Sequence, residues 1–267
     1  MDNKVVFNKE LIRRYDTFGP RYTSYPTAVQ FTTDYNDKDY LNWVKNSNED
    51  PIPAPISLYL HIPFCDTICY YCGCSKLVTK DKSKAEPYIH LLKKEIRMQG
   101  ALFARDREVT QIQWGGGTPT FLNDEQNYDI ISCIRENFNV PSSEKVELGI
   151  EVDPRTVDQL RIKNLANIGF NRISFGVQDF DRDVQEAVNR VQTTEDIQQL
   201  IDDARTQHFK SINIDLKNGL PHQTLKTVSK TLHNTIQSNQ DRIAIYNYAH
   251  HPEMIKPQRR INQEYLP

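Results

Sequence analysis

Hydrophobic positions between residues 57 and 246 recur with two different periods. Short runs rich in β-branched and aromatic residues alternate with longer segments in which apolar residues return every three or four positions. The short runs predict strands over 57–62, 111–114, 146–152, 172–176, 211–216 and 242–246. The longer segments predict helices over 84–103, 124–138, 157–168, 181–189, 194–207 and 225–238. This alternation indicates an α/β fold of parallel β/α units.

The first 56 residues have a different pattern. They are polar, rich in Tyr and Pro, and end in Pro51-Ile-Pro-Ala-Pro55, which cannot continue a helix. We therefore expect an irregular N-terminal arm over 1–56 and a β/α core over 57–267. Polar clusters follow the predicted strands of the core, where closed barrels and open doubly wound sheets alike place their ligand sites. The alternation alone leaves both architectures open.

Composition narrows the class of protein. The chain has 33 Lys and Arg against 35 Asp and Glu, a formal charge of -2, which argues against non-specific binding to nucleic acid. The sequence lacks an apolar run of about 18 residues, and its start lacks the apolar stretch of a signal peptide. We expect a cytoplasmic monomer that acts on small molecules, with no membrane span and no nucleic-acid partner.

Four of the five cysteines lie within ten residues. Cys65, Cys69 and Cys72 are separated by three and two residues and follow the first predicted strand. Reducing conditions oppose disulfides, and structural zinc would need a second cysteine pair. Three thiolates suit one [4Fe-4S] cluster whose fourth iron is open to another ligand. Zinc, or three unrelated buried cysteines, are the alternatives.

The Cys-x3-Cys-x2-Cys pattern resembles the radical S-adenosylmethionine (SAM) superfamily. The resemblance implies a partial (β/α)6 TIM-like barrel in which the open iron chelates SAM. It also implies that a 5'-deoxyadenosyl radical from the cofactor, rather than a protein side chain, carries the hard chemistry. Three consecutive glycines, at 115–117, form either a tight turn or a place where a ligand approaches the backbone. They resemble the family loop that binds the methionyl amino group.

A closer resemblance covers essentially the whole chain. The sequence is similar to the oxygen-independent coproporphyrinogen III oxidase family at Gly19-Pro-Arg-Tyr-Thr-Ser-Tyr-Pro-Thr-Ala28, Tyr59-Leu-His-Ile-Pro-Phe-Cys65, Cys72-Gly-Cys74, 114–120, 151–155, 176–180 and Asn247-Tyr-Ala-His250. That family decarboxylates two propionates of coproporphyrinogen III to vinyls in haem biosynthesis, giving protoporphyrinogen IX, and requires an electron donor and an electron acceptor.

The resemblance also implies two SAM sites. The first would contain Tyr59, Tyr71, Gly116 and Glu151. The second would contain Gly117, Thr118, Gln178, Arg190, Asp215 and Ala249.

Some positions depart from the family pattern. Tyr71 stands where the family commonly has Phe, and Lys217 and Asn218 replace two apolar residues beside the second proposed SAM site. Cys74 and the arm motif favour the oxidase over related haem-chaperone-like proteins, while Cys133 fits a small core residue.

Chain length adds a further expectation. Family members continue well beyond position 267, so we expect the C-terminal helical domain to be absent and the outer face of the last strand to be exposed. Three hypotheses therefore remain open: an oxidase, a haem-binding relative, and a catalytically inactive fragment.

Overall fold

The computed structural model describes residues 6–17, 27–142 and 144–267. The chain packs as two compact units, Met1–Asn46 and Ser47–Pro267, each described separately below. Of the arm motif quoted above, positions 19–26 lie outside the described residues. The predicted boundary at 56/57 remains a prediction.

The smaller unit contains more regular structure than its sequence suggested. It holds helix α1 (Lys9–Tyr15), the 3-10 turn η1 (Ala28–Gln30) and most of helix α2 (Asp37–Asn48). The side chain of Asn8 caps α1 by accepting a hydrogen bond from the Leu11 N–H at 2.9 Å. The expectation of an irregular arm is therefore wrong for these segments, because local caps and acidic first turns start helices within a polar stretch.

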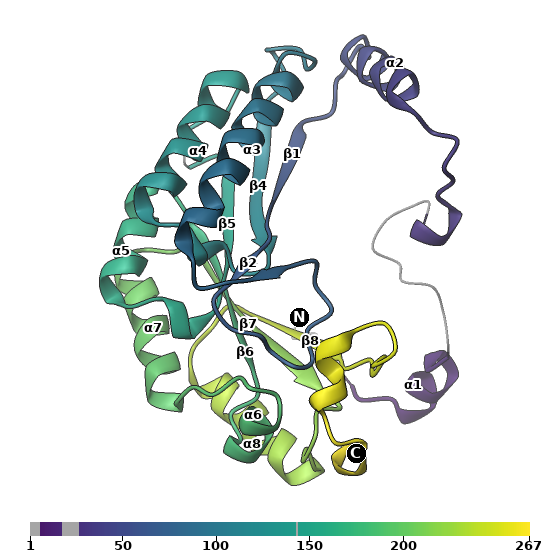
Figure 1. Cartoon of the computed structure of the whole chain (residues 1–267), viewed down its shortest axis with the longest axis vertical. Coiled ribbons are helices and arrows are strands. Elements are labelled where there is room, and N and C mark those ends of the chain that lie inside the picture. The colour runs from purple at the N-terminus through teal and green to yellow at the C-terminus, as the bar shows by residue number, and fades with distance from the viewer. Residues whose placement is uncertain (1–5, 18–26, 143) are drawn as a thin grey trace. The chain divides into compact units, whose positions relative to one another are not determined.

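The larger unit is built on one parallel sheet (Figure 1). Neighbouring strands follow chain order, and the first and last form the sheet edges. The strands are β1 (Ile56–Ile62), β4 (Val109–Gly116), β5 (Glu147–Val152), β6 (Arg172–Gln178), β7 (Ser211–Asn218) and β8 (Arg242–Asn247). All six predicted strands are confirmed, and the arrangement is a partial (β/α)6 barrel.

Six helices follow the strands, as predicted. They are α3 (Ala85–Gly100), α4 (Asp124–Asn137), α5 (Gln159–Ile168), α6 (Arg182–Ala187), α7 (Thr194–Thr206) and α8 (Leu225–Gln237). Side-chain caps mark the starts of α4 to α8, whereas α3 has none: Asn123 forms a capping box with Gln126, and Asp158 caps α5. Helix α5 begins later than predicted because the 3-10 turn η4 (Pro154–Thr156) precedes its cap.

Residues alternate between the two faces of the sheet. The side under the helices, called here the outer face, carries apolar residues such as Ile112, Ile150 and Ile214, each 2% exposed or less. Figure 1 shows α3, α4, α5 and α7 along this side. Burying one such side chain contributes about 1.5–3 kcal/mol, so the outer face holds the core. The opposite side, the inner face, carries mostly polar residues and glycines.

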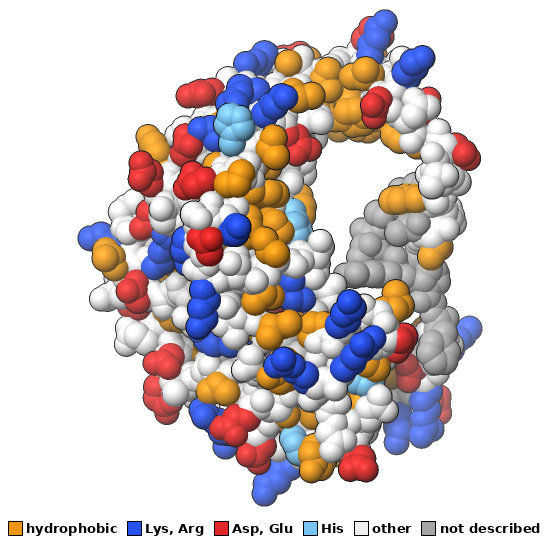
Figure 2. Space-filling view, viewed as in Figure 1, with side chains coloured by type: hydrophobic (Ala, Val, Ile, Leu, Met, Phe, Trp, Pro, Cys, Tyr) orange, Lys and Arg blue, Asp and Glu red, His pale blue; other side chains and the backbone are white. Residues whose placement is uncertain are grey.

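The outer face is incompletely covered at its last strand. Ile243 and Ile245 of β8 are 38% and 55% exposed, which confirms the expectation for this strand. Helix α8 covers little apolar surface, since the side chains it buries are Thr231 and Thr235. Among the described residues, the helices are too short or too polar to cross a membrane. Acidic and basic side chains are interspersed over the helix-covered side of this unit (Figure 2).

Two short strands, which the sequence pattern did not predict, flank the cysteine motif. Strand β2 (Phe64–Cys65) pairs with β3 (Leu77–Val78). The Thr79 N–H donates to the Cys65 carbonyl at 2.9 Å and closes the segment between them. We call residues 65–76 the cysteine loop.

Candidate functional site

The cysteine loop is held in place by the turn after α6. The Tyr70 N–H donates to the Val188 carbonyl at 3.0 Å, and the Asn189 amide donates to the Ile68 carbonyl at 2.7 Å. Asn189 has a φ of 55°, a left-handed conformation that asparagine tolerates better than most residues. These bonds join segments about 120 residues apart and position the three thiols at the end of the sheet.

Hydroxyl and guanidinium donors face the sulfurs of Cys65 and Cys69. The Thr118 hydroxyl lies 3.5 Å from Cys65 Sγ, while the guanidinium groups of Arg155 and Arg190 lie 3.4 and 3.5 Å from Cys69 Sγ. A Cβ atom on Gly117 would lie 3.0 Å from Cys65 Sγ, so a larger residue would press on the sulfur. Such donors stabilise sulfur in its negatively charged form.

All three cysteines have free thiols, and their environments differ. A hydrogen bond from the Cys74 thiol, helped by the Lys76 ammonium, lowers the pKa of Cys72 to about 5. Burial raises the pKa of Cys65.

In the described part of the chain, no three His, Cys, Asp or Glu side chains converge on a single-ion site. An iron–sulfur cluster takes its cysteines on separate irons, so its thiols need not meet at one point. The donor set, three free thiols beside two guanidinium groups, fits such a cluster better than one zinc ion.

Asp153 organises the two arginines. Arg190 Nη1 lies 2.5 Å and Arg155 Nη2 2.7 Å from Asp153 Oδ2. Burial works against ionisation of Asp153, but the two guanidinium groups hold its pKa below the usual value. Arg190 is only 6% exposed, and its Nε has no hydrogen-bond partner among the described residues. A buried N–H without a partner, beside a sulfur, is a donor available to a bound group.

Of the glycine run, Gly115 and Gly116 end strand β4, and Gly117 follows it. Gly116 has a φ of +115°, and a Cβ there would lie 2.8 Å from the His61 ring. His61 Nε2 lies 2.9 Å from the Ser75 carbonyl, which can only accept, so Nδ1 accepts from the Tyr59 hydroxyl at 3.3 Å. The Gly116 N–H also donates to the Glu151 carboxylate, whose pKa burial and the nearby Asp215 raise.

A β-bulge shapes the end of β6. The pairing of β6 with β7 shifts between Gly176 and Gln178, and Gln178 adopts a φ of 73°. A Cβ on Gly176 would lie 3.0 Å from both the Arg190 guanidinium and the Gln178 amide. The bulge thus brings two predicted site residues together over one glycine.

Asp215 lies on the inner face and belongs to a small polar network. Its carboxylate accepts from the Ser174 hydroxyl at 3.0 Å and from the Asn213 amide at 2.8 Å. Burial raises the pKa of Asp215 despite these bonds. Strand β7 continues past Asp215 to Asn218, further than the sequence predicted, so Lys217 also belongs to the sheet.

Tyr71 and Ala249 are joined through a buried glutamine. Gln258 Nε2 donates to the carbonyls of both Tyr71 and Ala249, each at 3.1 Å. Ala249 itself is exposed. The structure therefore ties the segment after β8 to the cysteine loop, next to the C-terminal 3-10 turns (Figure 1).

Comparison with known proteins was made against family models, curated sequences and solved structures. A model described as the radical SAM superfamily matches residues 59–234, about two thirds of the chain. The chain belongs to the radical SAM superfamily.

The similarity to individual radical SAM proteins is closer still. Over 267 residues the chain is 45% identical to an oxygen-independent coproporphyrinogen III oxidase of Pseudomonas aeruginosa, covering 100% of this chain and 58% of that protein. The same identity holds over 264 residues with the Escherichia coli oxidase, covering 99% and 56%. The solved structure of the Escherichia coli enzyme aligns with a TM-score of 0.87 at 43% identity, covering 97% of this chain and 56% of that one. The chain thus spans somewhat more than half the length of these relatives.

Some residues of this candidate site were missed from the sequence. His61 lies two positions after Tyr59 and shares its face of β1, so strand alternation could have found it. Arg155 and Asp153 stood out only as polar residues at a strand end. Their contacts with Cys69 and Arg190 depend on tertiary structure. Cys133, in contrast, is buried within α4 as expected.

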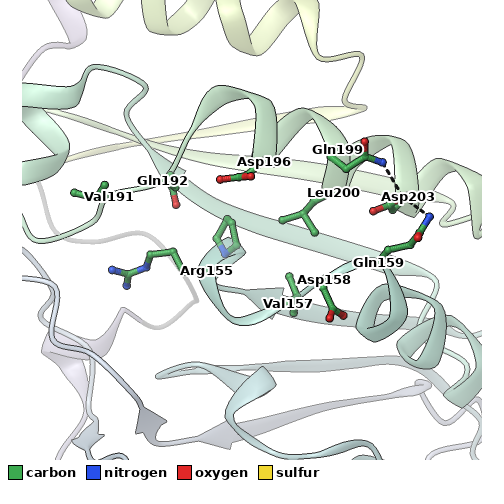
Figure 3. A pocket seen from close by; sticks show the side chains of 11 residues that line it. Arg155, Val157, Asp158, Gln159, Val191, Gln192, Asp196, Gln199, Leu200 and Asp203 are labelled. Atoms are coloured by element: carbon green, nitrogen blue, oxygen red, sulfur yellow. Dashed lines mark hydrogen bonds between the residues drawn. The ribbon is translucent and has the colours of Figure 1, made fainter.

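One cavity of this radical SAM chain lies outside the predicted site. It measures about 500 Å³ and lies between the start of α5 and helix α7, with Arg155, Gln192 and Asp203 on its walls (Figure 3). None of the predicted cofactor residues lines it. A second cavity of about 210 Å³ is lined by Thr118, Asp153 and Arg155, and so adjoins the cysteine loop.

Proposed function

We propose that this chain carries the radical SAM core of an oxygen-independent coproporphyrinogen III oxidase. The observation that carries the proposal is 45% identity to such oxidases over the whole chain. The reaction would convert two propionate side chains of coproporphyrinogen III to vinyls, each losing carbon dioxide, one hydrogen atom to the SAM-derived radical and one electron to an acceptor. The relatives are longer, so the complete activity is part of the proposal.

Cys65, Cys69 and Cys72 would hold the [4Fe-4S] cluster. Arg155 and Arg190 would offset its negative charge from the Cys69 side, and Thr118 would donate from the Cys65 side. The bound cluster and SAM would supply the one-electron chemistry that no side chain of this site can supply.

Two groups of residues would bind SAM. Around the first, the missing side chain of Gly116 makes room for the His61 ring, and Glu151 offers a carboxylate for an ammonium or hydroxyl donor. Tyr59 and Tyr71 would add aromatic surface there. In the second, Asp215 would accept from a hydroxyl while Gln178 and Arg190 act as donors, alongside Gly117, Thr118 and Ala249. The existence of two sites rests on the family resemblance.

Anaerobic reconstitution with iron and sulfide tests the cluster. We expect about four irons per chain, and loss of most of this iron in Cys72→Ser. Cys133→Ala is the matched control, because Cys133 is a buried thiol in α4 and should not affect iron content. A reconstituted chain without iron, or equal loss in both variants, would contradict the proposal.

A second experiment tests the reaction. The reduced, reconstituted chain should cleave SAM and convert coproporphyrinogen III to a vinyl-bearing product, followed by mass spectrometry. Asp215→Ala should weaken SAM binding, whereas exchanging the exposed Glu144 for Gln should not. Stable haem binding without decarboxylation would instead favour the haem-binding alternative. An intact cluster with unchanged SAM affinity in Asp215→Ala would indicate an inactive fragment.

A further inference from the structure

Lys217 lies on the inner face of β7, two residues after Asp215. Its Nζ is 5.2 Å from the centre of the Tyr71 ring and 5.5 Å from the centre of the Tyr246 ring. Tyr71 comes from the cysteine loop and Tyr246 from β8, so two separate elements place aromatic rings around one ammonium. A cation within about 6 Å of a ring centre is attracted by the negative face of the ring.

The ammonium of Lys217 has electrostatic neighbours but no hydrogen-bond acceptor. Across the described residues, no carboxylate forms an ion pair with it and no acceptor takes a hydrogen bond from it. The nearby Asp215 carboxylate is already bonded to Ser174 and Asn213. Aromatic faces attract the charge but accept N–H bonds only weakly, so up to three donors remain available.

The neighbouring cations at this end of the inner face are engaged. Arg155 and Arg190 share the carboxylate of Asp153, and Lys76 Nζ donates to the Cys72 carbonyl at 2.7 Å. Among these cations, Lys217 is therefore the one with no described hydrogen-bond acceptor for any of its donors, whereas Arg190 lacks a partner only at Nε. A half-buried ammonium in this state is completed best by an anionic acceptor, and a carboxylate oxygen forms the stronger, charge-assisted bond.

We infer that Lys217 is a carboxylate-binding residue of this site, with Tyr71 and Tyr246 positioning its ammonium. The inference rests on the proposed function, under which two ligands bring carboxylates to the inner face. These are the methionyl carboxylate of SAM and the propionates of the porphyrinogen substrate. The chemistry is the same in both cases, and ligands that differ only in the carboxylate distinguish them.

The test uses the reconstituted full chain under anaerobic conditions. Dissociation constants are measured for SAM against decarboxylated SAM, and for coproporphyrin III, the stable oxidised form of the substrate, against its tetramethyl ester. Lys217→Met keeps most of the side-chain volume and removes the charge, while Lys217→Arg keeps a cation. Iron content and circular dichroism establish that each variant is folded, and Lys217→Gln replaces the Met variant if that one is not.

We expect Lys217→Met to weaken binding of one carboxylate ligand about 10- to 100-fold. The matching ligand without its carboxylate should bind both proteins equally, and Lys217→Arg should retain most of the affinity. The pair that responds identifies the source of the carboxylate.

Equal binding of both acids by Lys217→Met and the unsubstituted chain would overturn the inference and leave the proposed function standing. Equal weakening of the acid and its ester would overturn it as well. If the unsubstituted chain binds none of the four ligands, both the inference and the proposed function fail.

Discussion

The two faces of the sheet are made by the same strands yet have opposite chemistry. On the outer face, Ile112, Ile150 and Ile214 are buried under helices. One residue further along the same strands, the inner face carries Gln113, Glu151 and Asp215. Burial stabilises the apolar residues of the outer face, but it raises the pKa of both Glu151 and Asp215 and so works against their charge.

The sheet therefore keeps the residues that stabilise the fold on one face and those of the candidate site on the other. The outer face contributes free energy of folding, while the inner face holds polar groups that folding alone does not favour. Where inner-face charges are paired, as at Asp153, the geometry is maintained by neighbouring guanidinium groups. Substitutions on the two faces should therefore change the free energy of unfolding in different directions as well as by different amounts.

The largest effect is expected for Arg190→Met, which would show that one part of the site does stabilise the fold. Removing a buried partner from an ion pair costs about 3–5 kcal/mol, and Asp153 would then keep only its pair with the less buried Arg155. Urea denaturation at neutral pH measures this loss. The control is Arg182→Met, which removes an exposed i,i+4 pair with Glu186 and should cost less than about 0.5 kcal/mol. Equal effects would contradict the assignment.

The same variant carries a pH signature. Because the folded pKa of Asp153 lies below its usual value, its ion pairs add stability above about pH 4 and lose it as the pH falls through the folded pKa. Arg190→Met should therefore show a shallower loss of stability on the acid side. An unchanged acid limb would mean that Asp153 is not the group that responds.

The next effect concerns the outer face. Ile214→Ala should destabilise the chain by about 3 kcal/mol, since the side chain is fully buried and a cavity remains. The free energy of unfolding from urea denaturation measures it, and SAM affinity of the reconstituted protein should be unchanged. If Ile214→Ala changed the free energy of SAM binding more than the free energy of unfolding, the two faces would not have separate roles.

Glu151→Gln should act in the opposite direction on stability. Burial, followed by repulsion from Asp215, raises the folded pKa of Glu151. The charged Glu151 therefore lowers the free energy of unfolding by its full amount above the folded pKa, and this loss disappears below the unfolded pKa of about 4.3. We expect the variant to be about 1 kcal/mol more stable at pH 7, to show no gain near pH 4, and to bind SAM more weakly. Denaturation at the two pH values, with the exposed Glu144→Gln as control, decides this.

The smallest effect is expected at β8, where helices cover the outer face incompletely. Ile245 lies on the same face as Ile214 but is 55% exposed. Ile245→Ala should therefore cost less than about 1 kcal/mol in the same urea assay. A loss as large as that of Ile214→Ala would mean that this part of β8 is covered in solution.

Much of the fold could be predicted because the spacing of apolar residues in a strand or helix shows which of its sides is buried. The runs around Ile150 and Ile214 alternate with polar residues, and the caps at Asn123 and Asp158 mark helix starts. Helix α1 was missed because it has only seven residues, too few for the apolar spacing of Leu11, Ile12 and Tyr15 to repeat. Strands β2 and β3 were missed because two residues are too short for a period.

The candidate site was only partly predictable. Cys65, Cys69 and Cys72 stood out by their spacing, a property of contiguous sequence. The contact of Arg190 with Cys69 joins positions 121 residues apart and depends on the turn after α6. The bulge before Gln178 and the placement of Lys217 between two tyrosines likewise involve neighbouring strands and the cysteine loop.

The six β/α units and the three-cysteine motif could be predicted from the amino-acid sequence, because both depend on the spacing of residues that are close together in the chain. Only the tertiary structure places donors beside the sulfurs of Cys65 and Cys69 and aromatic rings beside the ammonium of Lys217. The physical reason is that hydrogen bonds and ion pairs act within a few ångströms in space, whatever the separation along the chain. Lys217 shows this most clearly, since its sequence neighbours reveal neither Tyr71 nor Tyr246 beside its ammonium.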